Sequence, residues 1–183
     1  MAQSRGKLIE DLTQRIARTA IGAANLSAED RVLAGQRVQR AIAAEATAAH
    51  RDVAAWHRDK QSPDAEPFFD YLHSTDRPHV EQDRARPDGA AALDLAAEML
   101  ATDTATNDLD KRTAEYAADY IAHAALFAAE AEARKLPGGP SQGPAVAAGA
   151  AAAGPVAAPV AVAKAGGQAT KPPLIRNQPP SIG

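Results

Sequence analysis

The whole chain has no cysteine and few aromatic residues. Its last 47 positions also have no acidic residue. The absence of cysteine excludes a disulfide framework, a zinc ribbon and a thiol nucleophile. All seven aromatic residues, all five histidines and all 23 acidic residues lie in positions 1–136. The chain therefore changes character between Leu136 and Pro137, and we predict two parts: a folded domain over 1–136 and an arm over 137–183.

Motifs that mark well-known enzyme classes are also scarce. The sequence has no glycine-rich phosphate-binding loop and no His-Glu-x-x-His zincin motif. Composition and motifs together favour a non-enzymatic protein, and no cofactor is expected.

Apolar residues recur at three- and four-residue spacing through most of positions 1–136, which is typical of amphipathic helices. The clearest stripe belongs to a long helix over 28–60 and consists of Val38, Ile42, Ala46, Ala49, Val53 and Trp56. Further main helices are expected over 4–25, 89–101 and 108–135, with a short one at 68–72. We therefore predict an all-α fold: an Ala-rich helical bundle of about four main helices, followed by an extended Pro/Ala-rich C-terminal arm.

Several local features refine this prediction. Ser27 and Asp30 resemble a capping box, and Asp88 is expected to cap the helix that starts at Gly89. In the last helix, one stripe is predicted to face the core, and it comprises Leu109, Tyr116, Tyr120 and Phe127. The segment 73–83 is rich in histidine and acidic residues, and we expect it to be solvated, irregular chain.

Three aromatic residues lie close together at Phe68, Phe69 and Tyr71. They allow two interpretations: the rings cap the end of the bundle, which we favour, or they form a partner-binding surface.

A metal site is the best catalytic constellation in the sequence. Glu115, Asp119 and His123 repeat every four residues and share one helical edge, and His50 and His57 on the long helix are further possible ligands. The Glu-x-x-His pairs of di-iron bundles are missing, however, and a histidine at the edge of an aromatic stripe is commonly structural. A metal-binding bundle with an oxidase-like or storage role is therefore the alternative function.

Charge is distributed unevenly along the chain. Acidic residues exceed basic ones only in positions 61–136, which suggests pairing between early and late helices. This balance does not favour nucleic acid as a partner. We expect neither a signal peptide nor a membrane span, because the uncharged run 137–163 lacks Leu, Ile and Phe and is broken by prolines. The expected location is cytoplasmic or within a virion.

The arm holds nine of the thirteen prolines and is too poor in large apolar residues to form a core. Its end, 171–183, carries Leu174, Ile175 and Arg176 between two pairs of prolines and Ile182 after the second pair, which suggests a docking peptide. We therefore expect a structural protein of a large assembly, such as a virion component or a shell-tethered cargo, that binds protein subunits and forms homo-oligomers. A phasin-like granule coat is a further alternative.

Overall fold

The computed structural model describes residues 4–22, 24–75 and 77–138, and the regular structure in these ranges is entirely helical. The elements are α1 (Arg5–Gly22), α2 (Ala28–Arg58), a 3-10 helix η1 (Pro63–Ala65), α3 (Glu66–His73), α4 (Pro78–Ala85), α5 (Gly89–Thr102) and α6 (Lys111–Ala133). The all-α prediction is confirmed, and the four long helices α1, α2, α5 and α6 are the four main helices expected. Nearly all of the arm, from residue 139 onward, lies outside the described residues.

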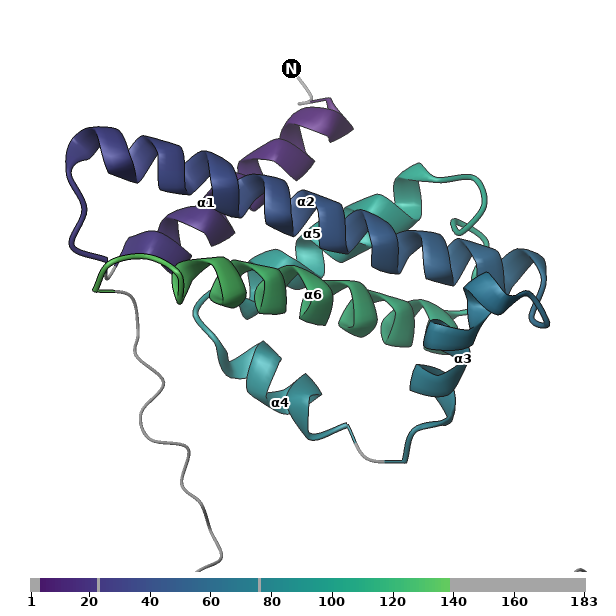
Figure 1. Ribbon diagram of the computed structural model, residues 1–183. Coiled ribbons are helices and arrows are strands. Elements are labelled where there is room, and N and C mark those ends of the chain that lie inside the picture. The colour runs from purple at the N-terminus through teal and green to yellow at the C-terminus, as the bar shows by residue number, and fades with distance from the viewer. Residues whose placement is uncertain (1–3, 23, 76, 139–183) are drawn as a thin grey trace, which may run out of the picture. The chain divides into compact units, whose positions relative to one another are not determined.

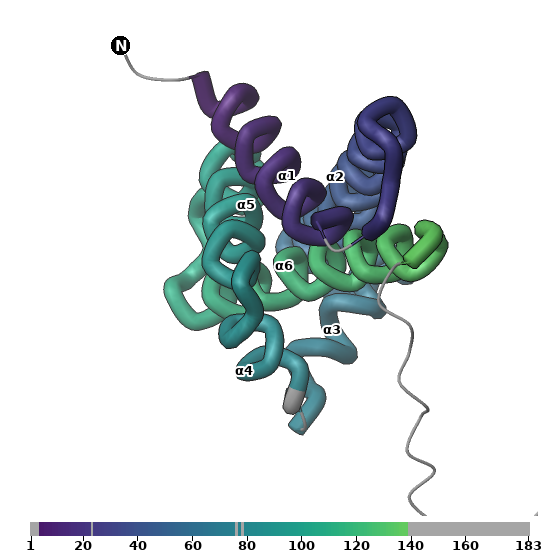
Figure 2. The backbone as a smooth tube through the Cα atoms, turned by 90° about the vertical axis from the view of Figure 1, so that its left-hand side faces the viewer, coloured from purple at the N-terminus to yellow at the C-terminus, as the bar shows by residue number. Residues whose placement is uncertain are grey.

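The antiparallel pair α2 and α6 forms the centre of the bundle (Figure 1). Opposite directions follow from the contacts at their ends, because His57 at the end of α2 lies 3.6 Å from Asp108, just before α6. α1 packs across both α2 and α5, and α5 packs along α6 (Figure 2). The short helices α3 and α4 cover the remaining flank of α6.

Small and β-branched side chains make up the core of this central pair. Five of the six residues in the predicted α2 stripe are buried, and Trp56 packs against the cluster that they form. This stripe is confirmed. The facing side of α6 is also built largely from small residues, with Ala117, Ile121 and Ala125 fully buried. Helices approach each other closely where alanine lines the contact, because interaxial distance depends on side-chain size.

The starts of α2 and α6 are capped by side chains, and the cap at Ser27 was predicted. Ser27 accepts a hydrogen bond from the Asp30 backbone N–H at 3.1 Å, and Asp110 accepts one from Thr113 at 3.0 Å. The capping prediction for Asp88 is wrong, since its side chain makes no capping bond. Its backbone, with φ −101° and ψ 2°, departs from the extended conformation that directs a cap side chain at the first turn.

The predicted inward stripe of α6 is also wrong in part. Phe127 is 58% exposed, while Leu109 and Tyr120 are partly buried against the core. The core face of α6 is the neighbouring stripe of alanines with Ile121 and Leu126. The spacing of the aromatic residues identifies one apolar face of α6. The face that packs against α2 is a different one, because smaller side chains allow the two helices to approach closely.

The segment 73–83 is not irregular as expected, because it contains α4. Pro78 occupies the first turn, where its missing N–H costs little. α4 has no buried apolar stripe, and its polar side chains attach it to α6 through hydrogen bonds and ion pairs. A helix of this kind has no hydrophobic periodicity to reveal it in the sequence.

Two glycines provide a test of packing at different places in the bundle. A Cβ on Gly89 would lie 2.1 Å from the carbonyl oxygen of Asp83, whereas one on Gly35 would meet Ile21 at an ordinary 3.6 Å. Gly89→Ala is therefore expected to lower the free energy of unfolding by about 1–3 kcal/mol through overpacking. Gly35→Ala is expected to raise it by about 0.5–1 kcal/mol through helix propensity. Urea denaturation measures both, and effects of the same sign would contradict this packing.

Candidate functional site

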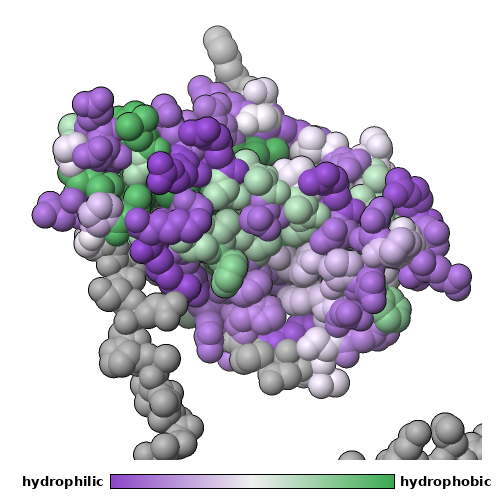
Figure 3. All heavy atoms as spheres, viewed as in Figure 1, coloured by the Kyte–Doolittle hydropathy of each residue, from purple (hydrophilic) through white to green (hydrophobic). Residues whose placement is uncertain are grey.

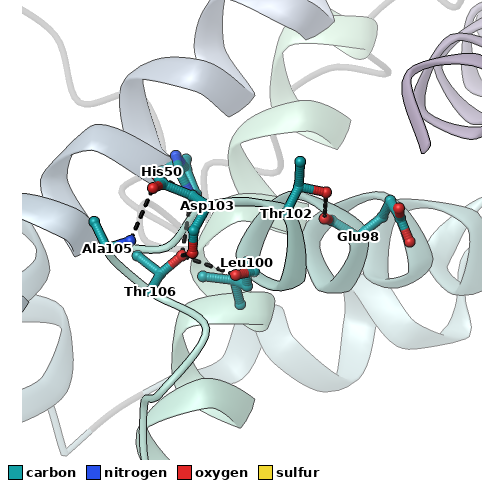
Figure 4. A network of polar contacts seen from close by, with 7 residues as sticks. All are labelled: His50, Glu98, Leu100, Thr102, Asp103, Ala105 and Thr106. Carbon is teal, nitrogen blue, oxygen red and sulfur yellow. Dashed lines mark hydrogen bonds and ion pairs between the residues drawn. The ribbon is translucent and has the colours of Figure 1, made fainter. Parts of the chain in front are cut away.

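His50, one of the possible metal ligands, forms a structural link between α2 and the loop after α5 (Figure 4). Its Nε2 lies 3.3 Å from Thr106 Oγ1 and 3.7 Å from Asp103. Thr106 is buried and donates its hydroxyl hydrogen to the Leu100 carbonyl at 2.9 Å. The Thr106 oxygen is then the acceptor, so the proton of the neutral imidazole resides on Nε2. Burial lowers the pKa of His50, and the negative charge of Asp103, which acts to raise this pKa, offsets only part of that effect.

Two buried carboxylates on different helices define a second network, which joins α4 to α6. Asp119 of α6 receives hydrogen bonds of 2.9 and 3.2 Å from Arg84 of α4. Asp83 of α4 lies 2.6 Å from His123 Nδ1 and 3.2 Å from Arg86. Arg86 also forms an ion pair with Glu130 at 2.8 Å. The network supplies each buried carboxylate with a cationic or hydrogen-bonding partner, which is the usual requirement for burying a charge.

The imidazole of His123 lies near two further rings at the edge of this network. Its centroid lies 4.3 Å from that of His79 and 6.2 Å from that of Phe127. Burial lowers the pKa of His79, and the adjacent His123 adds to that effect. Within the described residues, His79 Nε2 and the Tyr71 hydroxyl are buried and have no hydrogen-bond partner. Burial also raises the pKa of Tyr71 to about 12, so its phenol stays protonated near neutral pH.

An aromatic cluster fills the space between α2, α3 and α6. Phe68 is fully buried, and its ring contacts Trp56, Tyr71 and Tyr120 at centroid distances of 5.5, 6.3 and 5.4 Å. The Tyr120 hydroxyl donates to Asp52 on α2 at 3.0 Å. The partner-binding interpretation is therefore wrong for Phe68, because its ring is enclosed by the bundle. Tyr71 packs against the core as well, and these two residues follow the favoured capping interpretation.

Phe69 points the other way and is 41% exposed. Its ring lies 4.3 Å from that of His73, one turn later on α3. Beside it is a hollow of about 310 Å³ whose lining includes Pro63, Glu66 and Asp70. We name these five residues, Pro63, Glu66, Phe69, Asp70 and His73, the α3 face.

Other exposed apolar side chains lie where α2 begins. Val32 is 61% exposed and Leu33 is 54% exposed. Figure 3 shows apolar side chains gathered at this end of the bundle. One turn later along α2, a groove of about 410 Å³ runs between α1 and α2, with Ile9 and Ala43 in its lining.

The five possible metal ligands are distributed among separate contacts. His50 contacts Thr106, His57 faces Asp108, Asp119 pairs with Arg84 and His123 pairs with Asp83, while Glu115 is exposed. Among the described residues, no group of three or more histidine or acidic side chains is arranged to hold a metal ion. The geometry gives His50, His57, Asp119 and His123 roles in joining parts of the bundle, whereas Glu115 has no such role.

Sequence reasoning missed the partners in these networks, above all Asp83, Arg84 and Thr106. The many polar residues in 73–83 were the one sign in the sequence that this segment makes polar contacts. The sequence did not show that His79 and Asp83 contact His123 of α6. Leu174, Ile175, Arg176 and Ile182 of the docking peptide lie outside the described residues.

Comparisons with protein-family models, curated proteins and solved structures find no match to this chain. Over residues 4–22, 24–75 and 77–138, no helix is both long and apolar enough to cross a bilayer.

Asp119 and Glu115 provide a matched test of the structural role, because they are neighbours on α6 with the same side-chain chemistry. Asp119→Ala removes the partner of Arg84 and is expected to lower the free energy of unfolding by about 1–3 kcal/mol. Glu115→Ala changes an exposed residue and is expected to stay within about 0.5 kcal/mol of the native chain. Urea denaturation compares them, and equal effects would argue against the Arg84 link.

The lowered pKa of His50 predicts a pH dependence of stability. The unfolded chain, in which histidine has its ordinary pKa of about 6.5, binds the proton more readily than the folded chain. Stability is therefore lost as the pH falls from about 7.5 to about 5.5, a range in which most carboxylates remain ionised. His50→Gln is expected to flatten this decline in urea denaturation series. An unchanged slope in the variant would show that His50 does not contribute.

Proposed function

We propose that this protein is a non-enzymatic assembly protein, in which the helical bundle carries a C-terminal arm whose terminal peptide docks on a protein subunit. The large complex that it serves is of the kind formed by a virion or by a shell with tethered cargo, and the protein acts there as a homo-oligomer. The arm is the binding element, and the bundle is its scaffold.

One observation carries this proposal: the side chains with catalytic potential hold the helices together. Asp119 is bound by Arg84, Asp83 joins His123 to Arg86, and His50 fixes the loop that carries Thr106. A general base or metal ligand needs a lone pair directed toward substrate or metal, whereas these groups point into helix–helix contacts. Their geometry accounts for them as parts of a scaffold.

The surface of the bundle supports a role in protein contacts. Val32, Leu33, Phe69 and Phe127 are all more than two-fifths exposed. Large exposed hydrophobic side chains that gather in one place are characteristic of interaction surfaces. Val32 and Leu33 lie together at the start of α2, Phe69 lies on the α3 face, and Phe127 lies on α6.

The composition of the arm supplies the second half of the proposal. Leu174, Ile175 and Ile182 together contribute about 4–9 kcal/mol if fully buried, before the cost of ordering the chain. One copy therefore binds weakly. Several copies held together in an oligomer bind strongly, because each further contact is intramolecular.

Removal of the arm tests this function. A chain that ends at Leu136 is expected to lose its partners in co-purification and to decrease in oligomeric size by light scattering. In the full chain, Leu174→Asp with Ile175→Asp is expected to weaken binding at least about tenfold, since two buried aliphatic side chains are lost. The matched control is Val156→Asp with Val160→Asp, which adds the same charge within the arm but outside the terminal peptide.

The proposal fails if the truncated chain keeps every partner and its full size. It also fails if both pairs of substitutions weaken binding equally, because charge in the arm, rather than the terminal peptide, would then be responsible.

A further inference from the structure

We infer that the α3 face is the docking site for the terminal peptide, residues 171–183, of this same protein. The inference rests on the proposed function, because it names the surface that the arm binds. Three independent features of the α3 face point to this occupant: its exposed ring, its charge and its distance from the start of the arm.

The first feature is the chemistry of the surface. Phe69 presents its ring beside Pro63 and the hollow of about 310 Å³. Proline-rich peptides bind grooves lined by aromatic side chains, because extended proline segments lose little entropy on binding. The terminal peptide has paired prolines at 172–173 and at 179–180, with its aliphatic residues between and after them.

The second feature is charge complementarity. The segment 59–73, which forms the α3 face and its approach, carries four acidic residues against Lys60 alone. Glu66 and Asp70 are exposed at the hollow itself, whose lining contains one basic residue, Lys60. The terminal peptide is basic, with Lys171 and Arg176 and no acidic residue. Peptide and surface therefore attract each other.

The other hollows do not share this charge bias. The groove between α1 and α2 is lined by one acidic residue, Glu10, and one basic residue, Arg40. The hollow between α5 and α6 likewise pairs Lys111 with Glu115. Both hollows are more apolar than the α3 face, but the charges in their linings balance, so neither attracts a basic peptide.

The third feature is reach. The described chain ends at Gly138, beyond the C-terminal end of α6, where an added Cβ would lie 3.6 Å from the backbone nitrogen of Asn25, which precedes α2. The α3 face follows the other end of α2, and the 31 residues of α2 span about 45 Å. The 32 residues from 139 to 170 span about 28–34 Å as a coil. Because the same 32 residues reach about 100 Å when they are extended, the tether is long enough to bring the terminal peptide to the α3 face.

The absence of cysteine allows a direct test by crosslinking in the full-length chain. Gln178→Cys in the terminal peptide is combined with Gln61→Cys beside the α3 face, and a short bismaleimide is added. The matched control combines Gln178→Cys with Gln36→Cys in the α1–α2 groove, which is exposed to a similar degree. We expect preferential crosslinking of the Gln61 pair. A monomer-sized product indicates docking within one chain, and a dimer-sized product indicates exchange between two copies.

Charge reversal tests the specificity of the contact in the same chains. Glu66→Lys with Asp70→Lys is expected to lower the yield of the Gln61 crosslink about tenfold, as is Lys171→Glu with Arg176→Glu. Combining all four substitutions is expected to restore it. Glu66 and Asp70 are exposed, so circular dichroism is expected to show an unchanged fold.

Equal crosslinking at Gln61 and Gln36, or a charge reversal that has no effect, overturns this inference. If removal of the arm still abolishes partner binding in that case, the proposed function stands and only the docking site is wrong. If removal of the arm has no effect either, both proposals fall.

Discussion

The close contact between α2 and α6 is the constraint on which the rest of the bundle depends. Ala46 and Ala49 on α2 and Ala117 and Ala125 on α6 are buried. Each alanine buries little apolar area, so the stability of the pair comes from the length of the contact and from tight packing. Ile42, Val53 and Ile121 supply most of the larger side chains in this part of the core.

A core of this kind needs additional links at its edges, and the polar networks provide them. Arg84 and Asp119 attach α4, His50 and Thr106 attach the loop after α5, and Tyr120 with Asp52 joins α6 to α2 at its side. Each link connects residues that are at least 35 positions apart in the chain. His50 and Asp119, which suggest catalysis in the sequence, are used in these links.

Features that depend on one continuous helix could be predicted from the sequence, whereas features that depend on contacts between distant segments could not. The α2 stripe was predictable because one continuous helix carries the whole pattern. The core face of α6 was not predictable, because alanines give a weaker hydrophobic signal than the aromatic stripe beside them. Phe127 belongs to that aromatic stripe and is nevertheless exposed. α4 was missed because its partners, Asp119 and His123, come from a distant part of the chain. Phe68 and Phe69 are adjacent, and only the position of α3 decides which ring is enclosed.

The bundle is a scaffold held by internal contacts, and we propose that its α3 face is the surface on which the arm docks. Amide hydrogen exchange tests this division most directly, by comparing the full chain with its Leu174→Asp, Ile175→Asp variant. The account predicts faster exchange of α3 amides in the variant and unchanged exchange at the centre of α2 and α6. Unchanged exchange in α3, or a change confined to the α1–α2 groove, would contradict it.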